Sequence, residues 1–212
     1  MTKLIIFDVW GTLIETGVRP SPSKQVKYFL RDRRDFSEFV LHFEEVFLTK
    51  EYESLKQGFE EVVNEFGLRI PDFVYDKLIG MWNKNAILAK EYEDTFEVLE
   101  DLKKEGYKLA LLANIDKFSW EQLKQKFELD KYFDKVFLSF ETGKLKHNET
   151  AYKDILKAFK VKSDDAVMIG DGIESDMESS AKSDIKGILI DRRDSREFQN
   201  KITSLKEIKE NL

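Results

Sequence analysis

The sequence predicts an α/β fold, in which a parallel sheet carries helices on both faces and a block of helices interrupts the sheet after its first strand. Short apolar runs recur along the 212 residues, and most are separated by segments with helical periodicity. From about Lys24 to Leu88 only helical patterns are found. We therefore expect a sheet domain made of residues 1–16 and 92–212, and a helical domain at residues 17–91.

The first strand is predicted at residues 4–7, because four consecutive apolar residues fit a strand that is buried on both faces. Gly11 and Thr12 then force the chain to turn. Asp8 therefore lies at the carboxyl edge of the sheet, where open α/β sheets bind their ligands. A carboxylate at this edge is a candidate nucleophile or metal ligand, although an Asp that simply opens a turn has the same local pattern.

Four amphipathic helices are predicted in the inserted block, and the short links between them favour a small helical bundle. Residues 17–23 and 89–93 are expected to act as hinges on either side of it. Gly67 should end the third helix, and Pro71 should open the fourth. The Phe-rich faces of these helices are interpreted as the bundle core, and only secondarily as the wall of an apolar pocket.

Strands and helices alternate again after the insertion, which predicts the remainder of the parallel sheet. Helix starts are indicated where an acidic or hydroxyl residue is followed three positions later by Glu or Gln, as at Asp94, Ser119 and Ser204. Another helix follows from the apolar spacing between Tyr152 and Phe159. The predicted strands are residues 109–113, 136–138, 166–169 and 187–190.

Composition argues against several classes of function. The formal net charge of -6 disfavours a nucleic-acid partner, because such proteins need a basic surface to displace counterions from phosphates. No Cys is present, so neither disulfides nor a thiolate metal site can form. No apolar run approaches the roughly 20 residues of a membrane span, and the run near the start is too short for a signal peptide. We expect a cytoplasmic protein without a membrane partner.

Polar residues collect at the predicted carboxyl ends of the strands. Asp8 follows the first strand and Asn114 the second, and Lys146 comes a few residues after the third. The fourth strand is followed by Asp171, with Asp176 further on. Each is ordinary by itself, since Asn and Asp are common in turns and a lone Lys is usually solvated. Together, two acidic groups could share Mg²⁺ while the Lys neutralises a bound anion.

These residues resemble the motifs of the haloacid dehalogenase-like hydrolase superfamily, whose members carry D-x-D-G-T, a Ser or Thr, a Lys, and Gly-Asp followed by Asp. The resemblance covers the whole chain, because the helical insertion is similar to the mobile C1-type cap of that superfamily. It implies a Rossmann-like three-layer core with an inserted helical cap. The corresponding segments here are Asp8-Val9-Trp10-Gly11-Thr12, Ala113-Asn114, Lys146, and Gly170-Asp171 with Asp176.

The resemblance implies that Asp8 is the nucleophile of a hydrolase, forming an aspartyl intermediate that water then hydrolyses. In the phosphatase branches the cofactor is Mg²⁺, which would be bound by Asp8, Asp171 and the main-chain carbonyl of Trp10. Asp176 would support the metal, either as a ligand or through its neighbours.

The same resemblance assigns contacts with a small-molecule substrate. Lys146 would act in catalysis by pairing with Asp8 and with the substrate phosphate, so that two negatively charged groups can approach each other. Thr12 would hold the first-motif loop and the anion, and Asn114 would also bind the substrate.

Two positions depart from the phosphatase pattern. Position 10 normally carries an Asp that serves as general acid to the leaving group and later as base for water, but Trp10 has no proton to give. Position 113 normally carries a hydroxyl that hydrogen-bonds the phosphate, but here it is Ala113. Without the acid, acyl and aryl phosphates should be preferred over alkyl phosphates, because their leaving groups depart unaided. Asp116 and His147 are the candidates for a surrogate acid.

Three functions therefore remain open, namely a Mg²⁺-dependent phosphatase, a 2-haloacid dehalogenase, and a catalytically impaired binding protein. Dehalogenases have an aromatic residue at the position of Trp10, but they typically carry Ser and Asn where this chain has Gly170 and Asp171. The retained metal-binding acids favour the phosphatase. A dehalogenase also needs an Arg for the substrate carboxylate, and none is compelling by spacing among Arg19, Arg31, Arg33 and Arg34.

Overall fold

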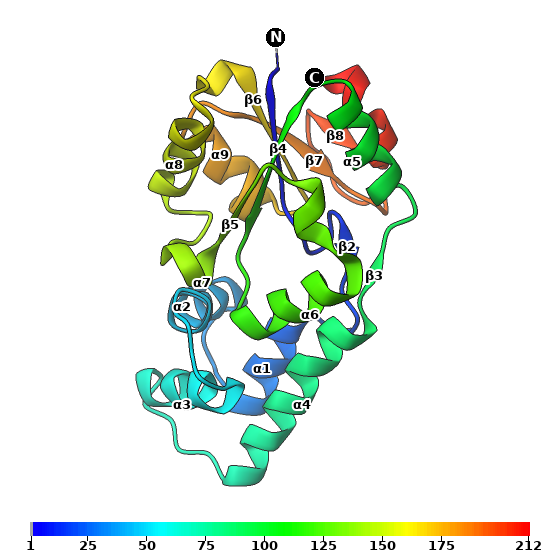
Figure 1. Ribbon diagram of the computed structural model, residues 1–212. Coiled ribbons are helices and arrows are strands. Elements are labelled where there is room, and N and C mark those ends of the chain that lie inside the picture. The colour runs from blue at the N-terminus through cyan, green and yellow to red at the C-terminus, as the bar shows by residue number, and fades with distance from the viewer. Residues whose placement is uncertain (1) are drawn as a thin grey trace.

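A computed structural model of the protein describes residues 2–212. Its centre is a parallel sheet of six strands in the order β5-β4-β1-β6-β7-β8 (Figure 1). The predicted α/β fold and the five predicted strands are confirmed. The strand bounds are β1 Leu4–Phe7, β4 Lys108–Ala113, β5 Lys135–Leu138, β6 Ala166–Gly170, β7 Lys186–Ile190 and β8 Lys201–Ile202.

Both faces of the sheet are covered by helices. On β1, Ile5 and Phe7 pack toward α5, α6 and η4, whereas Leu4 and Ile6 pack toward α8 and η3. Successive side chains of a strand point to opposite faces, so the unbroken apolar run buries both sides of the sheet. The helix bounds are α5 Thr95–Lys104, α6 Lys117–Phe127, α8 Glu149–Phe159, the π-helix η3 Ile173–Glu178 and the 3-10 helix η4 Leu205–Asn211.

One predicted helix start is wrong, and another is correct but lacks its expected side-chain cap. The helix expected at Ser119 begins earlier, because the side chain of Asp116 accepts a hydrogen bond from the main-chain N of Ser119 (3.0 Å) and caps it. Asp94 precedes α5, but its carboxylate pairs with Arg192 (2.7 Å) and makes no cap. The start at Ser204 is confirmed by a capping box, which opens a 3-10 helix.

The inserted block forms four helices around a second apolar cluster, to which Leu145 and Phe118 of the sheet domain also belong. Aromatic rings dominate this cluster, and the ring of Phe47 lies 4.6 Å from that of Phe59 and 5.0 Å from that of Trp82 between centroids. Gly67, with φ of 62°, follows the third helix, and Pro71 is the residue before the fourth. The bounds are α1 Pro22–Leu30, α2 Phe36–Phe47, α3 Leu55–Glu65 and α4 Asp72–Leu88.

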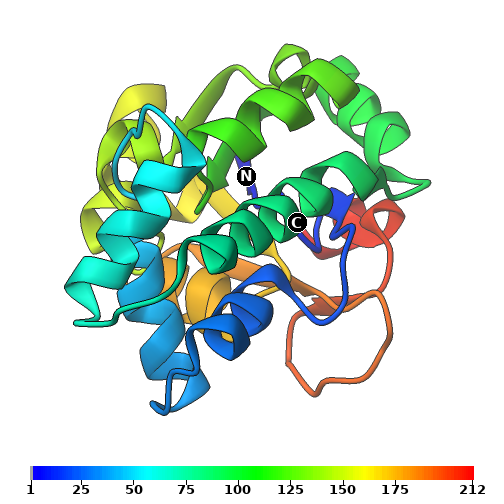
Figure 2. The ribbon, with the colours of Figure 1, turned by 90° about the horizontal axis from the view of Figure 1, so that it is seen from below.

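The helical block lies at the carboxyl edge of the sheet, below the strands in Figure 1 and toward the viewer in Figure 2. The connections on either side of it, β2 (Ile14–Glu15) and β3 (Lys90–Glu91), pair antiparallel. These strands and β8 were not predicted, because such short strands show no periodicity. Helix α4 runs beside α6, and the indole N–H of Trp82 donates to Asp116 across their contact (2.8 Å). The block therefore stands over the edge where Asp8 ends β1.

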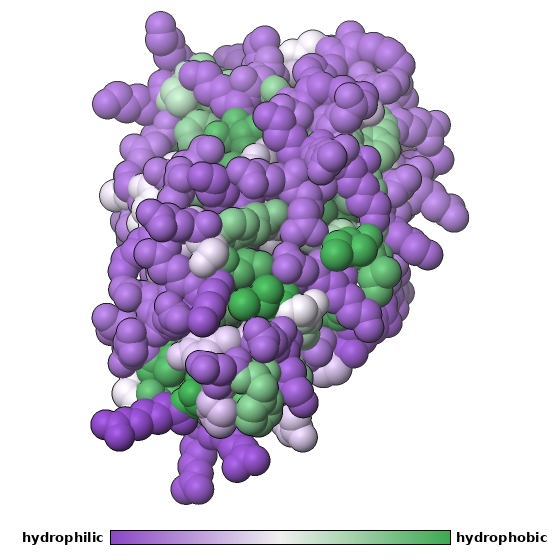
Figure 3. Space-filling model, turned by 60° about the horizontal axis from the view of Figure 1, so that its bottom comes forward, coloured by the Kyte–Doolittle hydropathy of each residue, from purple (hydrophilic) through white to green (hydrophobic). Residues whose placement is uncertain are grey.

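The surface on the side of the helical block is mostly hydrophilic, with smaller apolar areas between the polar ones (Figure 3). Among residues 2–212, no helix is both long enough and apolar enough to cross a membrane. The remaining short elements are η1 Leu129–Tyr132, α7 Ser139–Thr142, η2 Ser163–Asp165 and α9 Ser179–Ala181. The exposed large apolar side chains within the described range all belong to helices of the block, and they are Tyr28, Phe36, Leu41, Phe73, Ile87 and Leu88.

Candidate active site

Asp8 lies at the centre of the carboxyl edge of the sheet. It follows β1, which has β4 on one side and β6 on the other, so Asn114 and Asp171 flank it. Open α/β sheets form a crevice where neighbouring strands connect in opposite directions across the sheet, and β1 occupies that position. The main-chain N of Asp8 donates to the carbonyl of Ile169 on β6 (3.0 Å). The structure thus brings together residues that the sequence predicts from separate strand ends.

Lys146 is a buried cation between two carboxylates. Its ammonium donates to Asp8 Oδ1 and to Asp176 Oδ1, the latter at 2.7 Å. Burial disfavours the charge on Lys146, but the carboxylates of Asp176 and Asp8 outweigh it and raise the pKa of the ammonium above its ordinary value. Lys146 is therefore not the solvated residue that its sequence context alone would suggest.

Asp8, Asp171 and Asp176 each offer one carboxylate oxygen, and these three oxygens lie within 4.8 Å of one another. Burial is the main cause that raises the pKa of Asp8 to about 6 and that of Asp171 to about 7, and neighbouring carboxylates add to it. Three carboxylates beside one ammonium leave a surplus of negative charge. Because carboxylate oxygens are the ligands that hard divalent cations prefer, these residues fit a divalent cation.

Asp176 has a different environment from the other two carboxylates. Its Oδ1 accepts from Lys146, and its Oδ2 accepts from the main-chain N of Gly172 (2.8 Å). A Cβ at Gly170 would collide with this carboxylate, so the end of β6 can pack against Asp176 only as glycine. Both oxygens of Asp176 are engaged, which orients the Lys146 ammonium and the loop that carries Asp171.

The turn after β1 is fixed from several sides. The hydroxyl of Thr12 donates to Asp8 Oδ2 (3.2 Å), and the carbonyl of Thr12 accepts from the guanidinium of Arg192 (2.7 Å). Gly11 has φ of 80°, and a Cβ there would collide with the carboxylate of Asp171. Arg192 is held in turn by Asp94, which explains why that carboxylate is not a helix cap. The Asp8 carboxylate is therefore positioned by residues from distant segments.

Trp10 is half-buried and packs against the apolar cluster on the α5 and α6 face of the sheet. It lines a pocket of about 460 Å³ together with Asp171, Tyr92 and arginines of the loop after β7. One of these, Arg192, lies over the ring of Tyr92 at 4.1 Å from its centroid. The indole of Trp10 has no acidic proton, so the position of the expected general acid supplies none to this pocket.

Asn114 connects the sheet to the helical block. Its Oδ1 accepts from the main-chain N of Lys146 (2.9 Å), and its Nδ2 donates to Glu44 on α2 (2.8 Å). Ala113, the residue before it, is buried in the apolar cluster on the α5 and α6 face of the sheet. Its side chain therefore adds no polar group to the site. The helical block therefore contributes a carboxylate, Glu44, close to the end of β4.

The two candidates for a surrogate acid, Asp116 and His147, have different surroundings in the structure. The buried carboxylate of Asp116 accepts hydrogen bonds from Ser119 and from the indole of Trp82, so it serves to start α6 and to join α4 to it. Both oxygens of Asp116 are engaged in these contacts, so the structure gives no support to its surrogate role. His147 lies at the rim of a second pocket, where its ring nitrogen Nε2 is 3.7 Å from a carboxylate oxygen of Glu45.

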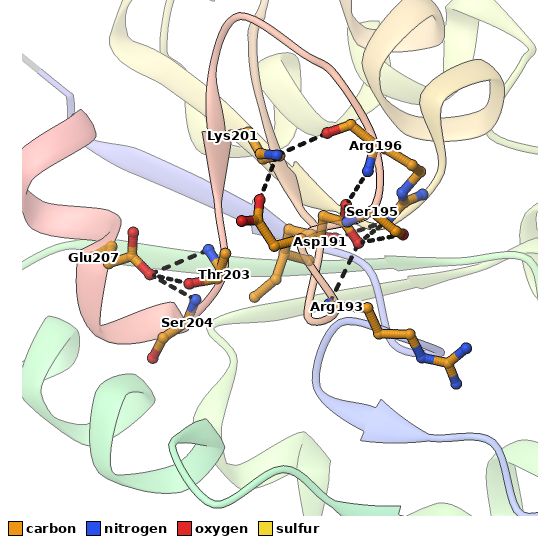
Figure 4. A network of polar contacts seen from close by, with 10 residues as sticks. Asp191, Arg193, Ser195, Arg196, Lys201, Thr203, Ser204 and Glu207 are labelled. Carbon is orange, nitrogen blue, oxygen red and sulfur yellow. Dashed lines mark hydrogen bonds and ion pairs between the residues drawn. The ribbon is translucent and has the colours of Figure 1, made fainter.

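The loop after β7 is organised by Asp191 (Figure 4). Its carboxylate accepts hydrogen bonds from the main-chain N of Ser195 (2.7 Å) and of Arg196 (2.6 Å), which turns the loop back on itself. The guanidinium of Arg196 then reaches the carbonyls of Asp171 and Ile190. This loop therefore holds the main chain at Asp171. It was not predicted as part of the site, although an Asp followed by several basic residues after a strand was a visible indication.

Comparisons with known proteins identify the family to which this chain is similar. Residues 2–184 match the family described as haloacid dehalogenase-like hydrolase. A relative from Pyrococcus furiosus named glyceraldehyde 3-phosphate phosphatase is 28% identical over 180 residues, which cover 82% of this chain and 75% of that one.

Two solved structures share the fold at low sequence identity. A 2-haloacid dehalogenase from Pseudomonas syringae pv. Tomato is 16% identical with a TM-score of 0.66, and the match covers 99% of this chain and 97% of that one. A HAD family enzyme from Bacteroides thetaiotaomicron, solved with magnesium and inorganic phosphate, is 17% identical with a TM-score of 0.63. That match covers 94% of this chain and 98% of the other. At these identities the two structures support the fold alone.

Proposed function

Because the chain belongs to the haloacid dehalogenase-like hydrolase family, we propose that it is a Mg²⁺-dependent phosphatase that acts on a small phosphorylated molecule. The observation that carries this proposal is the cluster of Asp8, Asp171 and Asp176 beside Lys146. A dehalogenase has no need of a carboxylate at the position of Asp171, whereas a phosphatase needs one to hold the metal. The relative named glyceraldehyde 3-phosphate phosphatase supports a small phosphate ester as the substrate.

In this proposal Asp8, Asp171 and the main-chain carbonyl of Trp10 would hold Mg²⁺, and Asp176 would support the site through Lys146 and Gly172. The ion supplies positive charge that offsets the negative charge of the phosphate and of the two carboxylates. The carboxylate of Asp171 receives no hydrogen bond from another group of residues 2–212, so both of its oxygens are available for a ligand.

Asp8 is proposed to attack phosphorus with a carboxylate oxygen while the ester P–O bond breaks and its electron pair leaves with the alcohol oxygen. Lys146 neutralises the attacking group and the phosphate as they approach. Water then attacks phosphorus in the aspartyl phosphate, which releases inorganic phosphate and restores Asp8. Thr12 and Asn114 hold the nucleophile loop and the substrate anion.

Residues 17–91 are proposed to form a cap that opens and closes over Asp8. Support comes from the position of α1 to α4 over the carboxyl edge, and from the paired connections β2 and β3, on which such a block could pivot. The main-chain N of Gly17 donates to Asn85 of α4 (3.0 Å), which ties the first connection to the last helix of the block. Closure would exclude bulk water while the phosphoryl group passes from the substrate to Asp8.

A second candidate function, 2-haloacid dehalogenase, is favoured by one observation, the aromatic residue Trp10 beside the nucleophile. A screen for phosphate and halide release separates the candidates, using glyceraldehyde 3-phosphate, aryl and acyl phosphates, and 2-haloacids. Phosphate release that requires Mg²⁺ and stops with a chelator supports the phosphatase. Halide release that is indifferent to the chelator selects the dehalogenase, and no turnover of any substrate favours a catalytically impaired binding protein.

A further inference from the structure

A second pocket, of about 480 Å³, lies between helix α2 and the loops that follow β4 and β6. Its wall on the side of the helical block is largely apolar, and Phe36 and Leu41 at its edge are 39% and 49% exposed. Asn114 and Gly172 line its other side, so the pocket borders the residues that contact Lys146 and Asp176. An apolar pocket with a few convergent polar groups is typical of a small-molecule site.

Glu44 is the acidic group that α2 places in this pocket. One of its oxygens, Oε2, accepts from Asn114 Nδ2 at 2.8 Å. The other oxygen has no hydrogen-bond partner among residues 2–212, and the side chain is only partly accessible to solvent. A carboxyl group that is held at one oxygen and free at the other can present a proton in a fixed direction.

Short contacts connect Glu44 to the reacting centre. Asn114, which holds Glu44, also accepts from the main-chain N of Lys146 (2.9 Å), and the side chain of Lys146 donates to Asp8. Burial raises the pKa of Glu44 to about 7, its bond to Asn114 and the charge of Lys146 lower it, and the charges of Asp176 and Asp8 raise it. A carboxyl group with such a pKa is partly protonated near neutral pH, as general acid catalysis requires.

We propose that this pocket receives the leaving group of the phosphate ester, and that Glu44 supplies the proton that Trp10 cannot. The inference rests on the proposed phosphatase function. As the P–O bond breaks, the proton on Glu44 passes to the departing oxygen, which leaves as an alcohol. The Glu44 carboxylate then accepts a proton from the water that attacks the aspartyl phosphate, and both Glu44 and Asp8 return to their starting states.

Other titratable groups around the pocket fit this task less well. Glu174 lines it as an exposed side chain, and the guanidinium of Arg196 is held by the main-chain carbonyls of Asp171 and Ile190. His147 stands at the rim beside Glu45, with a side chain that is 37% exposed. Glu44 is the one carboxyl of this pocket that is bound to Asn114.

The test compares two substrates that differ in their need for an acid, sn-glycerol 3-phosphate and 4-nitrophenyl phosphate. Glu44→Gln keeps an oxygen that can accept from Asn114 but has no transferable proton. The variant should lose about 10²- to 10⁴-fold in kcat on glycerol 3-phosphate, the usual contribution of general acid catalysis, and far less on 4-nitrophenyl phosphate. An equal loss on both substrates, or no loss on either, would overturn the inference while leaving the phosphatase proposal intact.

Two control variants complete the experiment. Glu38→Gln removes the same charge from an exposed position on α2 and should leave both rates unchanged. His147→Gln should cause no selective loss on glycerol 3-phosphate, and a loss confined to that substrate would transfer the acid role to His147. If the natural protein with Mg²⁺ releases phosphate from neither substrate, the phosphatase proposal fails, and the role of Glu44 fails with it.

Discussion

At the scale of single residues, the site depends on one buried lysine. Lys146 donates to both Asp8 and Asp176, and no other ammonium lies in the acidic cluster formed within residues 2–212. Its removal would leave carboxylates facing one another in a buried position. The same residue therefore affects both stability and activity.

Lys146→Met should make this double effect measurable. We expect the free energy of unfolding in urea to fall by about 3–5 kcal/mol, the usual cost of breaking a buried ion pair from one side. Phosphate release should fall by at least about 10²-fold, because the nucleophile and the phosphate would then repel each other. Lys144→Met, at a partly exposed position next to this site, is the control. Near-normal turnover in Lys146→Met would show that the lysine has no part in the reaction.

The protonation of Glu44 should determine how the rate of phosphate release depends on pH. Glu44 must carry its proton to act as an acid, and burial raises its pKa to about 7. The kcat/KM for an alkyl phosphate should therefore fall as the pH rises through that value, because the acid form is lost, whereas ionisation of the nucleophile Asp8, whose pKa burial raises to about 6, limits the rate on the acid side. Asp8, Asp176 and Lys146 act on Glu44 through their charges, so the profile is compared with that of Glu44→Gln. If the variant kept the same fall, another group would be responsible for it.

At the scale of elements, the helical block is stabilised by its own aromatic cluster. Phe47 is buried on α2 and contacts the rings of Phe43, Phe59 and Trp82. A Cβ at Gly58 would crowd Phe47, so α3 approaches α2 closely at this point. Helix α2 also carries Glu44 and the wall of the second pocket, so its packing and the site are coupled.

Phe47→Ala should lower the free energy of unfolding by about 3–5 kcal/mol, because it leaves a large cavity in this cluster. Phe73→Ala removes the same atoms from a side chain that is 58% exposed, and it should change stability by less than about 0.5 kcal/mol. Urea denaturation measures both values. Similar effects of the two substitutions would mean that the aromatic cluster does not hold the block together.

The elements also show what the sequence could predict. Strands such as β1 and β6 were predicted because every residue in them is buried, which produces an unbroken apolar run. The start of α5 at Asp94 was predicted correctly, but the expected side-chain cap was not, because the Asp94 carboxylate pairs with Arg192, a residue far away in the sequence. Glu44 was not predicted, because a polar residue in an amphipathic helix gives no indication of whether it faces solvent or a pocket.

At the scale of the whole molecule, the sheet and the helical block meet through both apolar and polar contacts. Trp82 bonds Asp116, Glu44 bonds Asn114, and Gln122 donates to Asn83 (3.1 Å). The sequence predicted that the carboxylates at the strand ends would meet, because parallel strands share one carboxyl edge. It could not predict these contacts between the block and the sheet, since they depend on how the two parts pack.

Metal binding should stabilise the whole molecule. At a Mg²⁺ concentration about 100 times its Kd, binding to the folded state alone adds about 2.7 kcal/mol to the free energy of unfolding. The Tm should therefore rise with Mg²⁺ and fall back when a chelator removes it. Asp171→Asn should abolish this rise, whereas Asp164→Asn, at an exposed position away from the site, should keep it. An undiminished rise in Asp171→Asn would remove the metal assignment.

Phosphoryl transfer through Asp8 can be observed in a single-turnover experiment. Enzyme in excess over a ³²P-labelled phosphate ester is quenched with acid in the presence of Mg²⁺, and the label on the protein is counted. We expect transient labelling of the natural protein, which disappears as inorganic phosphate accumulates, and no labelling of Asp8→Asn. Phosphate release that proceeds without labelled protein and persists in Asp8→Asn would show that Asp8 is not the nucleophile.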